Sequence, residues 1–284
     1  MCTWNSVSRA ADPEQVYCTT ALHQGAILSP HPHPLALVTG TSSGIGEALA
    51  RELLRRGWHV IGASRRAPAI ADSRYAHLRV DLEDLSALPA LLEAQVRGRL
   101  TDQAVNRLAL VNNAAMLGLL GPVALMDPGE MMRVYAVNTG APTLLMGWFL
   151  QNTPAGVPVR IVNVSSGVAV AAYPGTGGYG NTKAALRNVG MNLAAELDAD
   201  APAGSAARDA TVLSYEPGAV DTPMQTAVRE STVEVLPIVG FFQDLAAQGQ
   251  LLDPALPAAE IADYLEADGH PRWMERRYES KAPK

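Results

Sequence analysis

The chain has 284 residues, of which 48% are hydrophobic, and its formal net charge is −6. That is enough for a buried core in one large α/β domain, and the acidic balance without a dense basic block argues against nucleic-acid binding. No apolar run is long enough to cross a bilayer, so we expect no membrane association. The two cysteines, Cys2 and Cys18, precede the domain, so the domain itself cannot hold an internal disulfide, which is typical of proteins in the reducing cytoplasm. No Cys/His spacing predicts a metal site.

The first 34 residues differ in character from the rest of the chain. They mix polar residues with Pro and His, and they lack the basic and apolar regions of a signal peptide. We therefore expect a disordered N-terminal extension over residues 1–34, with a start site placed too early as the alternative interpretation. Residues 35–284 are expected to form a single domain.

A glycine-rich turn, 39–46, follows the first predicted strand, 35–38, and leads into a helical pattern over 47–56. Glycine allows a tight turn and a close approach of the backbone to a ligand, and the helix N-terminus offers free N–H groups to a pyrophosphate. A strand, such a turn and a helix in this order predict a dinucleotide site. The residues assigned to it are Gly40, Thr41, Ser42, Ser43, Gly44, Ile45 and Gly46.

The second predicted strand, 59–63, ends in Ser64-Arg65-Arg66. In dinucleotide-binding folds the end of this strand faces the adenosine ribose, where an acidic residue suits NAD and an arginine suits the 2′-phosphate of NADP. No Asp or Glu stands here, so Arg65 and Arg66 predict NADP(H) as the cofactor. The alternative is a solvated basic turn.

Further strands are predicted over 77–80, 108–111, 159–164 and 211–215, separated by helical patterns that include one long helix over 128–151. This alternation predicts an α/β fold with a Rossmann-like doubly wound parallel sheet in a single domain, and the segment 270–275 is expected to add a short seventh strand. Ligands of such sheets bind beyond the carboxyl ends of the strands. The residues that fall at those ends include Arg65, Asp81, Asn113, Ser166 and Pro217.

Tyr179 and Lys183 stand four residues apart at the start of a long helical pattern. Positions i and i+4 share one face of a helix, so the phenol and the ammonium can point into one site. A fixed positive charge is expected to lower the tyrosine pKa from its usual value of about 10, which suits proton transfer near neutral pH. Ser166 is expected to donate a hydrogen bond to the same substrate oxygen. The alternative for the Tyr179–Lys183 pair is a partly exposed helix face without a catalytic role.

In combination these residues resemble the short-chain dehydrogenase/reductase family over about residues 35–265. The motifs that match are TGTSSGIG at 39–46, NNAA at 112–115, Asn138, Ser166, Tyr179-x-x-x-Lys183 and PGAVDT at 217–222. The resemblance implies that Tyr179 is the catalytic acid/base, that Ser166 steadies the carbonyl, and that Lys183 holds the nicotinamide ribose and lowers the tyrosine pKa. It also implies that Asn138 supports a water-linked proton relay.

The same resemblance implies further cofactor contacts. Asp81 would contact the adenine, and Thr222 the nicotinamide carboxamide or a phosphate. The remaining cofactor-binding residues that it implies are Leu82, Asn113, Ala114, Ala115, Tyr179, Lys183, Pro217, Gly218 and Val220. Ala115 stands where the family usually has Gly, and its extra methyl is expected to alter the seating of the cofactor only slightly.

A narrower resemblance is to bacterial benzil reductases, which are relatives of sepiapterin reductase. It rests on the stretches 40–48, 64–66, 163–167, 220–225 and 251–254. It implies an NADPH-dependent carbonyl reductase that converts a ketone or vicinal diketone to an alcohol, with reduction of a pterin carbonyl as the nearest alternative. Two other classes stay open as alternatives. One is a non-catalytic dinucleotide sensor on the same fold, which would have no need of the proton donor Tyr179. The other is a sugar-nucleotide epimerase, for whose substrate domain the roughly 60 residues after Thr222 leave little room.

Residues 223–252 form a long connection after the last predicted motif, and they include Phe241 and Phe242. Long connections in compact domains are usually functional, so we predict a substrate lid with an apolar inner face. The alternative is a helix pair that packs on the core. Relatives pair through helices near 128–151 and 177–197, so the resemblance implies a homodimer or homotetramer that acts on a small-molecule carbonyl substrate.

Overall fold

A computed structural model describes residues 31–199 and 209–279 of the chain. Within these ranges the strands form one parallel sheet in the order β3-β2-β1-β4-β5-β6-β7. The chain builds one half of the sheet outward from its first strand and then returns to build the other half, which is the doubly wound order. The Rossmann-like fold expected from the sequence is therefore confirmed. The strands are β1 (His33–Thr39), β2 (His59–Ser64), β3 (Tyr75–Arg79), β4 (Val105–Asn112), β5 (Val159–Val164), β6 (Ala210–Glu216) and β7 (Trp273–Arg277).

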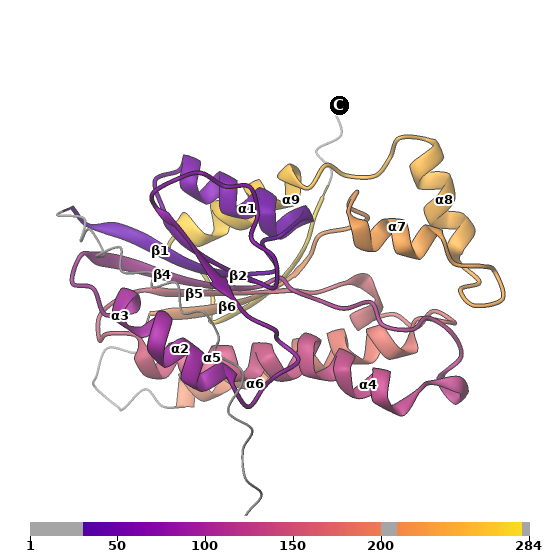
Figure 1. Cartoon of the computed structure of the whole chain (residues 1–284), viewed down its shortest axis with the longest axis horizontal. Coiled ribbons are helices and arrows are strands. Elements are labelled where there is room, and N and C mark those ends of the chain that lie inside the picture. Colours follow the sequence, from indigo (N-terminus) through magenta and orange to yellow (C-terminus); the bar gives the residue numbers. More distant parts are fainter. Residues whose placement is uncertain (1–30, 200–208, 280–284) are drawn as a thin grey trace, which may run out of the picture.

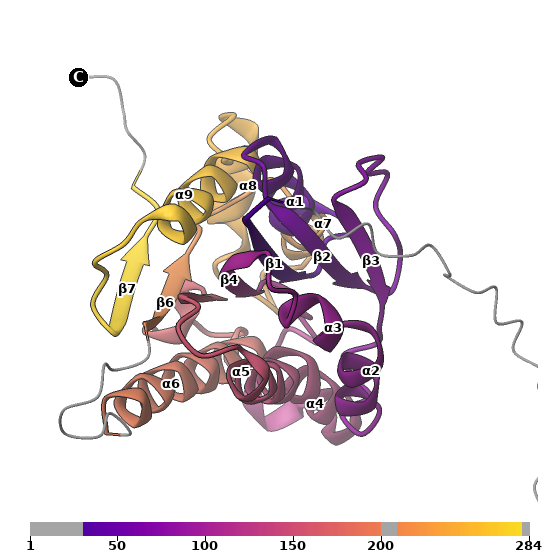
Figure 2. The ribbon, with the colours of Figure 1, turned by 90° about the vertical axis from the view of Figure 1, so that its left-hand side faces the viewer.

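Helices cover both faces of this sheet. They are α1 (Gly44–Arg55), α2 (Leu88–Gln95), α3 (Arg97–Leu100), α4 (Pro128–Tyr135), α5 (Ala141–Asn152), α6 (Gly177–Ala199), α7 (Pro223–Arg229), α8 (Val239–Ala247) and α9 (Ala255–Glu266). Figure 2 shows α1 and α9 above the sheet and α2 to α6 below it. In Figure 1, α7 and α8 lie beyond one end of the strands, away from both layers.

The core lies on both sides of the sheet because the central strands are almost continuously apolar. All six side chains of β5 are buried, as expected for a parallel strand covered by helices on both faces. Val159 and Ile161 join the cluster under α5 and α6, whereas Val162 and Val164 join the cluster under α1 and α9. The two-residue period of a strand thus assigns alternate side chains to opposite layers.

Arg160 is the charged residue of β5, and its side chain is only 1% exposed. Its guanidinium donates to Asp209 Oδ1 at 2.7 Å and to Asp268 Oδ1 at 3.0 Å. These carboxylates stand just before β6 and just after α9. The two ion pairs therefore compensate a buried charge and tie both connections to the amino end of the sheet.

Two boundaries differ from those expected. β1 begins at His33 rather than at residue 35, because His33 pairs with Val105 and its ring stacks on His59 at 3.8 Å between centroids. The expected helix over 128–151 is interrupted by a π-helical turn, Ala136–Gly140. Pro142 lacks the N–H that a continuous α-helix would donate to residue 138, which accounts for the interruption.

The seventh strand expected near the C-terminal end is present as β7, which pairs parallel to β6. Residues 1–30 of the expected N-terminal extension lie outside the described residues, as do residues 200–208 between α6 and β6.

No helix in the described ranges is long and apolar enough to span a membrane. Over the same ranges, no group of three or more His, Cys, Asp or Glu side chains is arranged to hold a metal ion.

Candidate active site

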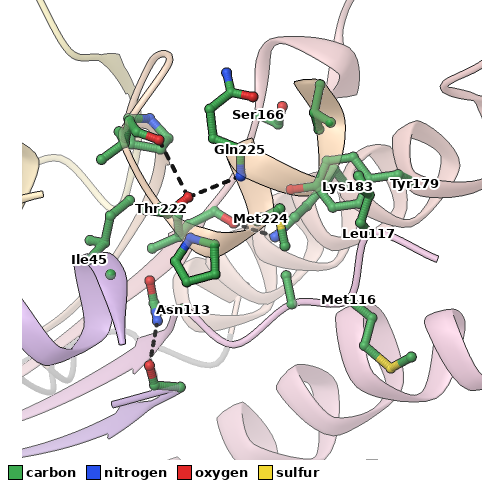
Figure 3. Close-up of a pocket in the computed structure, with 18 of the residues that line it drawn as sticks. Ile45, Asn113, Met116, Leu117, Ser166, Tyr179, Lys183, Thr222, Met224 and Gln225 are labelled. Atoms are coloured by element: carbon green, nitrogen blue, oxygen red, sulfur yellow. Dashed lines mark hydrogen bonds between the residues drawn. The ribbon is translucent and has the colours of Figure 1, made fainter. Parts of the chain in front are cut away.

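A cleft with a volume of about 1070 Å³ lies at the carboxyl ends of the strands and under α7 and α8. It gathers most of the residues assigned to the site from sequence, although they come from segments far apart in the chain (Figure 3). Those that line it are Gly40, Ser42, Ser43, Gly44, Ile45, Arg65, Arg66, Asp81, Leu82, Asn113, Ala114, Ala115, Ser166, Tyr179, Lys183, Pro217, Gly218, Val220 and Thr222. Thr41, Gly46 and Asn138 do not line it.

The turn between β1 and α1 forms one wall of the cleft. Its last residue before the helix, Ser43, has an extended backbone, and its side chain does not cap α1. The N–H groups of the first helical turn are therefore not engaged by that hydroxyl and can bind an anion. Gly44 has a φ of +58°, a left-handed conformation that favours glycine. This wall has the form of a phosphate-binding turn.

Gly46 and Thr41 support this turn from behind. A Cβ at Gly46 would overlap the carbonyl oxygen of Gly40, so only glycine allows the helix to pack so closely. Thr41 is fully buried, and its hydroxyl lies 3.1 Å from the hydroxyl of Tyr75. Thr41 and Gly46 therefore lie behind the turn and do not line the cleft, where the sequence predicts a direct contact with the cofactor.

Asn113 fastens the turn to the end of β4. Its side chain donates from Nδ2 to the carbonyl oxygen of Thr39 at 2.9 Å. The Thr39 hydroxyl in return accepts from the backbone N–H groups of Asn113 and Ala114, both at 3.0 Å. The side chain of Asn113 therefore positions the turn, and Thr39, the first residue of the 39–46 motif, supports it although it was not among the assigned cofactor-binding residues.

Arg65 and Arg66 stand at the end of β2 and both are exposed along the cleft. Within the described residues, neither guanidinium forms an ion pair with a carboxylate. The hydroxyl of Ser64 donates to the carbonyl oxygen of Arg66 at 2.8 Å, which fixes the backbone of this turn. Two unpaired cations on a fixed turn can bind an anionic group.

Tyr179, Lys183 and Ser166 come together on one side of the cleft. Lys183 is buried, donates from Nζ to the carbonyl oxygen of Val164 at 2.7 Å, and lies 5.6 Å from the centroid of the Tyr179 ring. This contact confirms that the two side chains share one helix face. Figure 3 shows Tyr179 and Lys183 from α6 side by side among the lining residues.

The pKa of Tyr179 is shifted opposite to the expected direction. Burial of the phenol raises its pKa, and burial of Lys183 lowers the pKa of its ammonium to about 8. The lowered tyrosine pKa expected from the sequence is therefore not what this structure shows, because removal of the phenol from water raises its pKa. Tyr179 is held as a protonated phenol, which is the form that can donate a proton.

Asn138 lies in the π-helical turn and is fully buried. Its side chain accepts from the N–H of Met116 at 2.7 Å and donates to the carbonyl oxygen of Met116 at 2.8 Å and to the hydroxyl of Thr182 at 3.0 Å. Thr182 in turn donates to the carbonyl oxygen of Tyr179 at 2.7 Å. The Asn138 side chain thus braces the helix that carries Tyr179, and the proton relay expected of it stays a prediction.

The segment 223–252 contributes α7 and α8 to the cleft. The two ends of the segment are held together by backbone hydrogen bonds. The N–H of Asp221 donates to the carbonyl oxygen of Leu252, and the N–H of Leu252 donates to the carbonyl oxygen of Ala219, both at 2.9 Å. The side chains that face the cleft include Met224, Val228, Leu236, Phe241, Phe242 and Leu245. The inner face of the segment is therefore largely apolar, as expected from the sequence.

The far end of this segment crosses to the opposite rim of the cleft. Gly175, in the connection between β5 and α6, has a φ of +85°, and a Cβ there would overlap the carbonyl oxygen of Val235 and lie 3.2 Å from Leu236 Cα. Gly175 also accepts a hydrogen bond from Gly121 N–H at 2.9 Å. Three loops meet at this glycine, a contact that no local sequence pattern predicts.

Comparisons with known proteins agree with this geometry. The family model for short chain dehydrogenase matches residues 34–232. Benzil reductase ((S)-benzoin forming) of Bacillus cereus is 29% identical over 245 residues, which cover 83% of this chain and 95% of that protein. Sepiapterin reductase of Meriones unguiculatus is 31% identical over 252 residues, which cover 82% of this chain and 92% of that protein.

Solved structures are similar over the same region. The crystal structure of the KRED1-Pglu enzyme has a TM-score of 0.72 and 25% identity, covering 84% of this chain and 99% of that chain. The crystal structure of 3-ketoacyl-(acyl-carrier-protein) reductase from Brucella melitensis complexed with NADH has a TM-score of 0.67 and 25% identity. The match covers 87% of this chain and 97% of that chain. The chain therefore belongs to the short-chain dehydrogenase/reductase family of oxidoreductases, which bind a nicotinamide dinucleotide and act on CH–OH or C=O groups.

Proposed function

We propose that this protein is an NADPH-dependent carbonyl reductase that reduces one carbonyl of a vicinal diketone. The observation that carries the proposal is the cleft itself, in which Tyr179, Lys183 and Ser166 line the same space as the unpaired Arg65 and Arg66. The first three residues supply proton-transfer chemistry. The two arginines suit a phosphorylated ribose.

The residues present fit a dinucleotide. The uncapped N-terminus of α1 suits the pyrophosphate, and the exposed guanidinium groups of Arg65 and Arg66 suit a 2′-phosphate. Asp81 and Leu82 at the end of β3 would hold the adenine, and Lys183 and Thr222 would hold the nicotinamide end. When bound, the reduced nicotinamide supplies a hydride to the carbonyl carbon.

The protein's own side chains act on the substrate oxygen. The Tyr179 phenol, whose pKa is raised by burial, donates its proton to the alkoxide that develops at the reduced carbonyl. The hydroxyl of Ser166 donates a hydrogen bond to the same oxygen. The Lys183 ammonium, held by the carbonyl oxygen of Val164, places a positive charge beside the tyrosine as its proton leaves.

The apolar inner face of the segment 223–252 supports an aromatic ketone as substrate. Phe241 and Phe242 both line the cleft, and their rings meet edge to face at 5.3 Å between centroids. The similarity to a benzil reductase points to the same class of substrate. We propose that this segment is a lid that covers the substrate and excludes water.

A pterin carbonyl is the second candidate substrate. Glu216, whose carboxylate lies 3.2 Å from Arg277 Nε, lines the cleft and adds polar groups that can bind the N–H groups of a pterin ring. The similarity to sepiapterin reductase points the same way.

The ketone specificity can be tested with purified protein. Oxidation of NADPH and of NADH would be followed with benzil, 1-phenyl-1,2-propanedione, sepiapterin and a simple aliphatic ketone. We expect the aromatic diketones to be the fastest substrates and NADPH to be strongly preferred. Preference for sepiapterin would favour the pterin candidate, and no turnover of any ketone by protein that binds NADPH would contradict the proposal.

The lid contact at Gly175 gives a second prediction. Gly175→Ala is expected to raise the KM for an aromatic diketone about tenfold, because the new methyl group displaces residues 235–236 and with them the lid. Steady-state kinetics would measure this change. Gly249→Ala is the matched control, since Gly249 has a similar φ of +65° but no atom within 4 Å of its added Cβ. Equal effects of the two substitutions would mean that backbone strain, and not the lid contact, is responsible.

The outer faces of α4, α5 and α6 carry partly exposed apolar side chains. They are Met131, Met132, Leu144 and Met191, which are 39%, 64%, 39% and 37% exposed. Exposed apolar patches mark protein interfaces. We propose that these helices form the interface of a homodimer or homotetramer.

A further inference from the structure

Gln225 carries a carboxamide that no group in the described part of the chain binds. The residue is only 7% exposed, and its Oε1 is buried without a hydrogen-bond partner. Its backbone N–H donates to the hydroxyl of Thr222 at 3.3 Å, so this contact with the start of α7 is made by the main chain and not by the carboxamide. The Gln225 side chain has no part in the proposed proton transfer and no assigned contact with the cofactor.

A buried amide without a partner is unfavourable, because it has lost its water without gaining a protein hydrogen bond. Asn138 illustrates the usual arrangement, since both ends of its buried amide are bonded to Met116 and Thr182. Gln225 is one of the residues that line the cleft, together with Ser166 and Tyr179, and its Nε2, unlike its Oε1, is not among the fully buried atoms. The NH₂ group is therefore the end of the carboxamide that a ligand in the cleft can reach, and a half-turn of the amide would bring the oxygen there in its place.

The position of Gln225 places it on the substrate side of the phosphate-binding turn. The helix α7 begins after Thr222, whose methyl group would lie 3.0 Å from a Cβ added at Gly44. Gln225 follows three residues later, about 4.5 Å further along the helix axis. Figure 3 shows its carboxamide directed away from Thr222.

We propose that the Gln225 carboxamide recognises an oxygen on the carbon next to the reacting carbonyl. This inference rests on the proposed function and names the feature by which the site would tell a vicinal diketone from a simple ketone. A carboxamide can present either its oxygen or, after a half-turn, its NH₂ group, so it can accept from an adjacent hydroxyl or donate to an adjacent carbonyl. A ligand with only hydrocarbon at that carbon leaves the buried amide without a partner.

The test compares three ketones that share one carbon skeleton. Benzil carries a carbonyl beside the reacting group, benzoin carries a hydroxyl there, and deoxybenzoin carries only a methylene. We expect Gln225→Met to lower kcat/KM for benzil and benzoin about tenfold and to leave the value for deoxybenzoin nearly unchanged. If wild type does not turn over deoxybenzoin, its inhibition constant against benzil takes the place of kcat/KM.

Two further measurements separate recognition from structural effects. Gln225→Met should not lower the melting temperature, because an apolar side chain replaces an amide that the protein leaves unbonded. It should also leave the Kd for NADPH unchanged. Gln248→Met serves as the matched control, since Gln248 is exposed on the same segment and does not line the cleft.

Equal losses for all three ketones, or a weaker affinity for NADPH, would overturn the inference and assign Gln225 to the cofactor or to the fold. Failure of the proposed function would look different, because wild-type protein would then reduce none of the ketones. In that case, calorimetric dissociation constants of the three ketones in wild type and Gln225→Met would still test whether Gln225 distinguishes them.

Discussion

Tyr179→Phe is expected to lower kcat for ketone reduction by about three orders of magnitude, which is within the range for loss of a general acid. The phenyl ring keeps the shape of the residue and its packing beside Lys183, so the Kd for NADPH should stay within about twofold of wild type. Only the proton donor is removed. Single-turnover kinetics with saturating NADPH would measure the chemical step directly.

The matched control for this prediction is Tyr135→Phe on α4, which removes a hydroxyl from a partly exposed tyrosine that does not line the cleft. It should leave kcat unchanged.

The pH profile of wild type adds an independent check. Because burial lowers the pKa of Lys183 to about 8, its positive charge is lost above that pH, and kcat/KM should fall there. Near-normal turnover by Tyr179→Phe would contradict the assignment of the proton donor.

Replacing both Arg65 and Arg66 with Ala is expected to raise the KM for NADPH about 100-fold, because two charge-assisted contacts to a phosphate are lost together. The KM for NADH should change little, since NADH has no 2′-phosphate. The preference between the two cofactors would therefore fall or reverse. Initial rates with benzil at varied NADPH and NADH would measure this ratio.

Arg79→Ala is the control for this pair. Arg79 is an exposed arginine at the end of the neighbouring strand, β3, and it does not line the cleft. Its removal should not alter the ratio. Higher ionic strength should weaken NADPH binding to wild type more than to the double variant, because salt screens exposed charges. An unchanged NADPH preference in the double variant would mean that the arginines form only a solvated turn.

The sheet could be predicted from the sequence because its strands are short apolar runs that end in recognisable motifs. β5 lies at its expected residues, 159–164, even though it contains Arg160. The pairing of Tyr179 with Lys183 could also be predicted, since helical spacing alone brings them to one face. These features depend on local periodicity, which a sequence shows directly.

Other features depend on contacts between distant segments and could not be predicted in this way. The direction of the Tyr179 pKa shift follows from how deeply α6 packs, and sequence spacing carries no measure of burial. The places of Thr41 and Gly46 behind the turn depend on the approach of Tyr75 to the first and of the Gly40 carbonyl to the second. The unpartnered amide of Gln225 becomes apparent only when the partners of every buried group are known.

The most direct test of the central claim is to follow the hydride itself. Benzil would be reduced with NADPH that carries deuterium at one or the other C4 position of the nicotinamide, and the product extracted quickly, before enolisation exchanges the label. We predict that the carbinol carbon of benzoin receives deuterium from one of the two labelled cofactors and not from the other. If neither labelled cofactor transferred deuterium to the benzoin, or if no benzoin formed, the result would contradict the account of this protein as an NADPH-dependent carbonyl reductase.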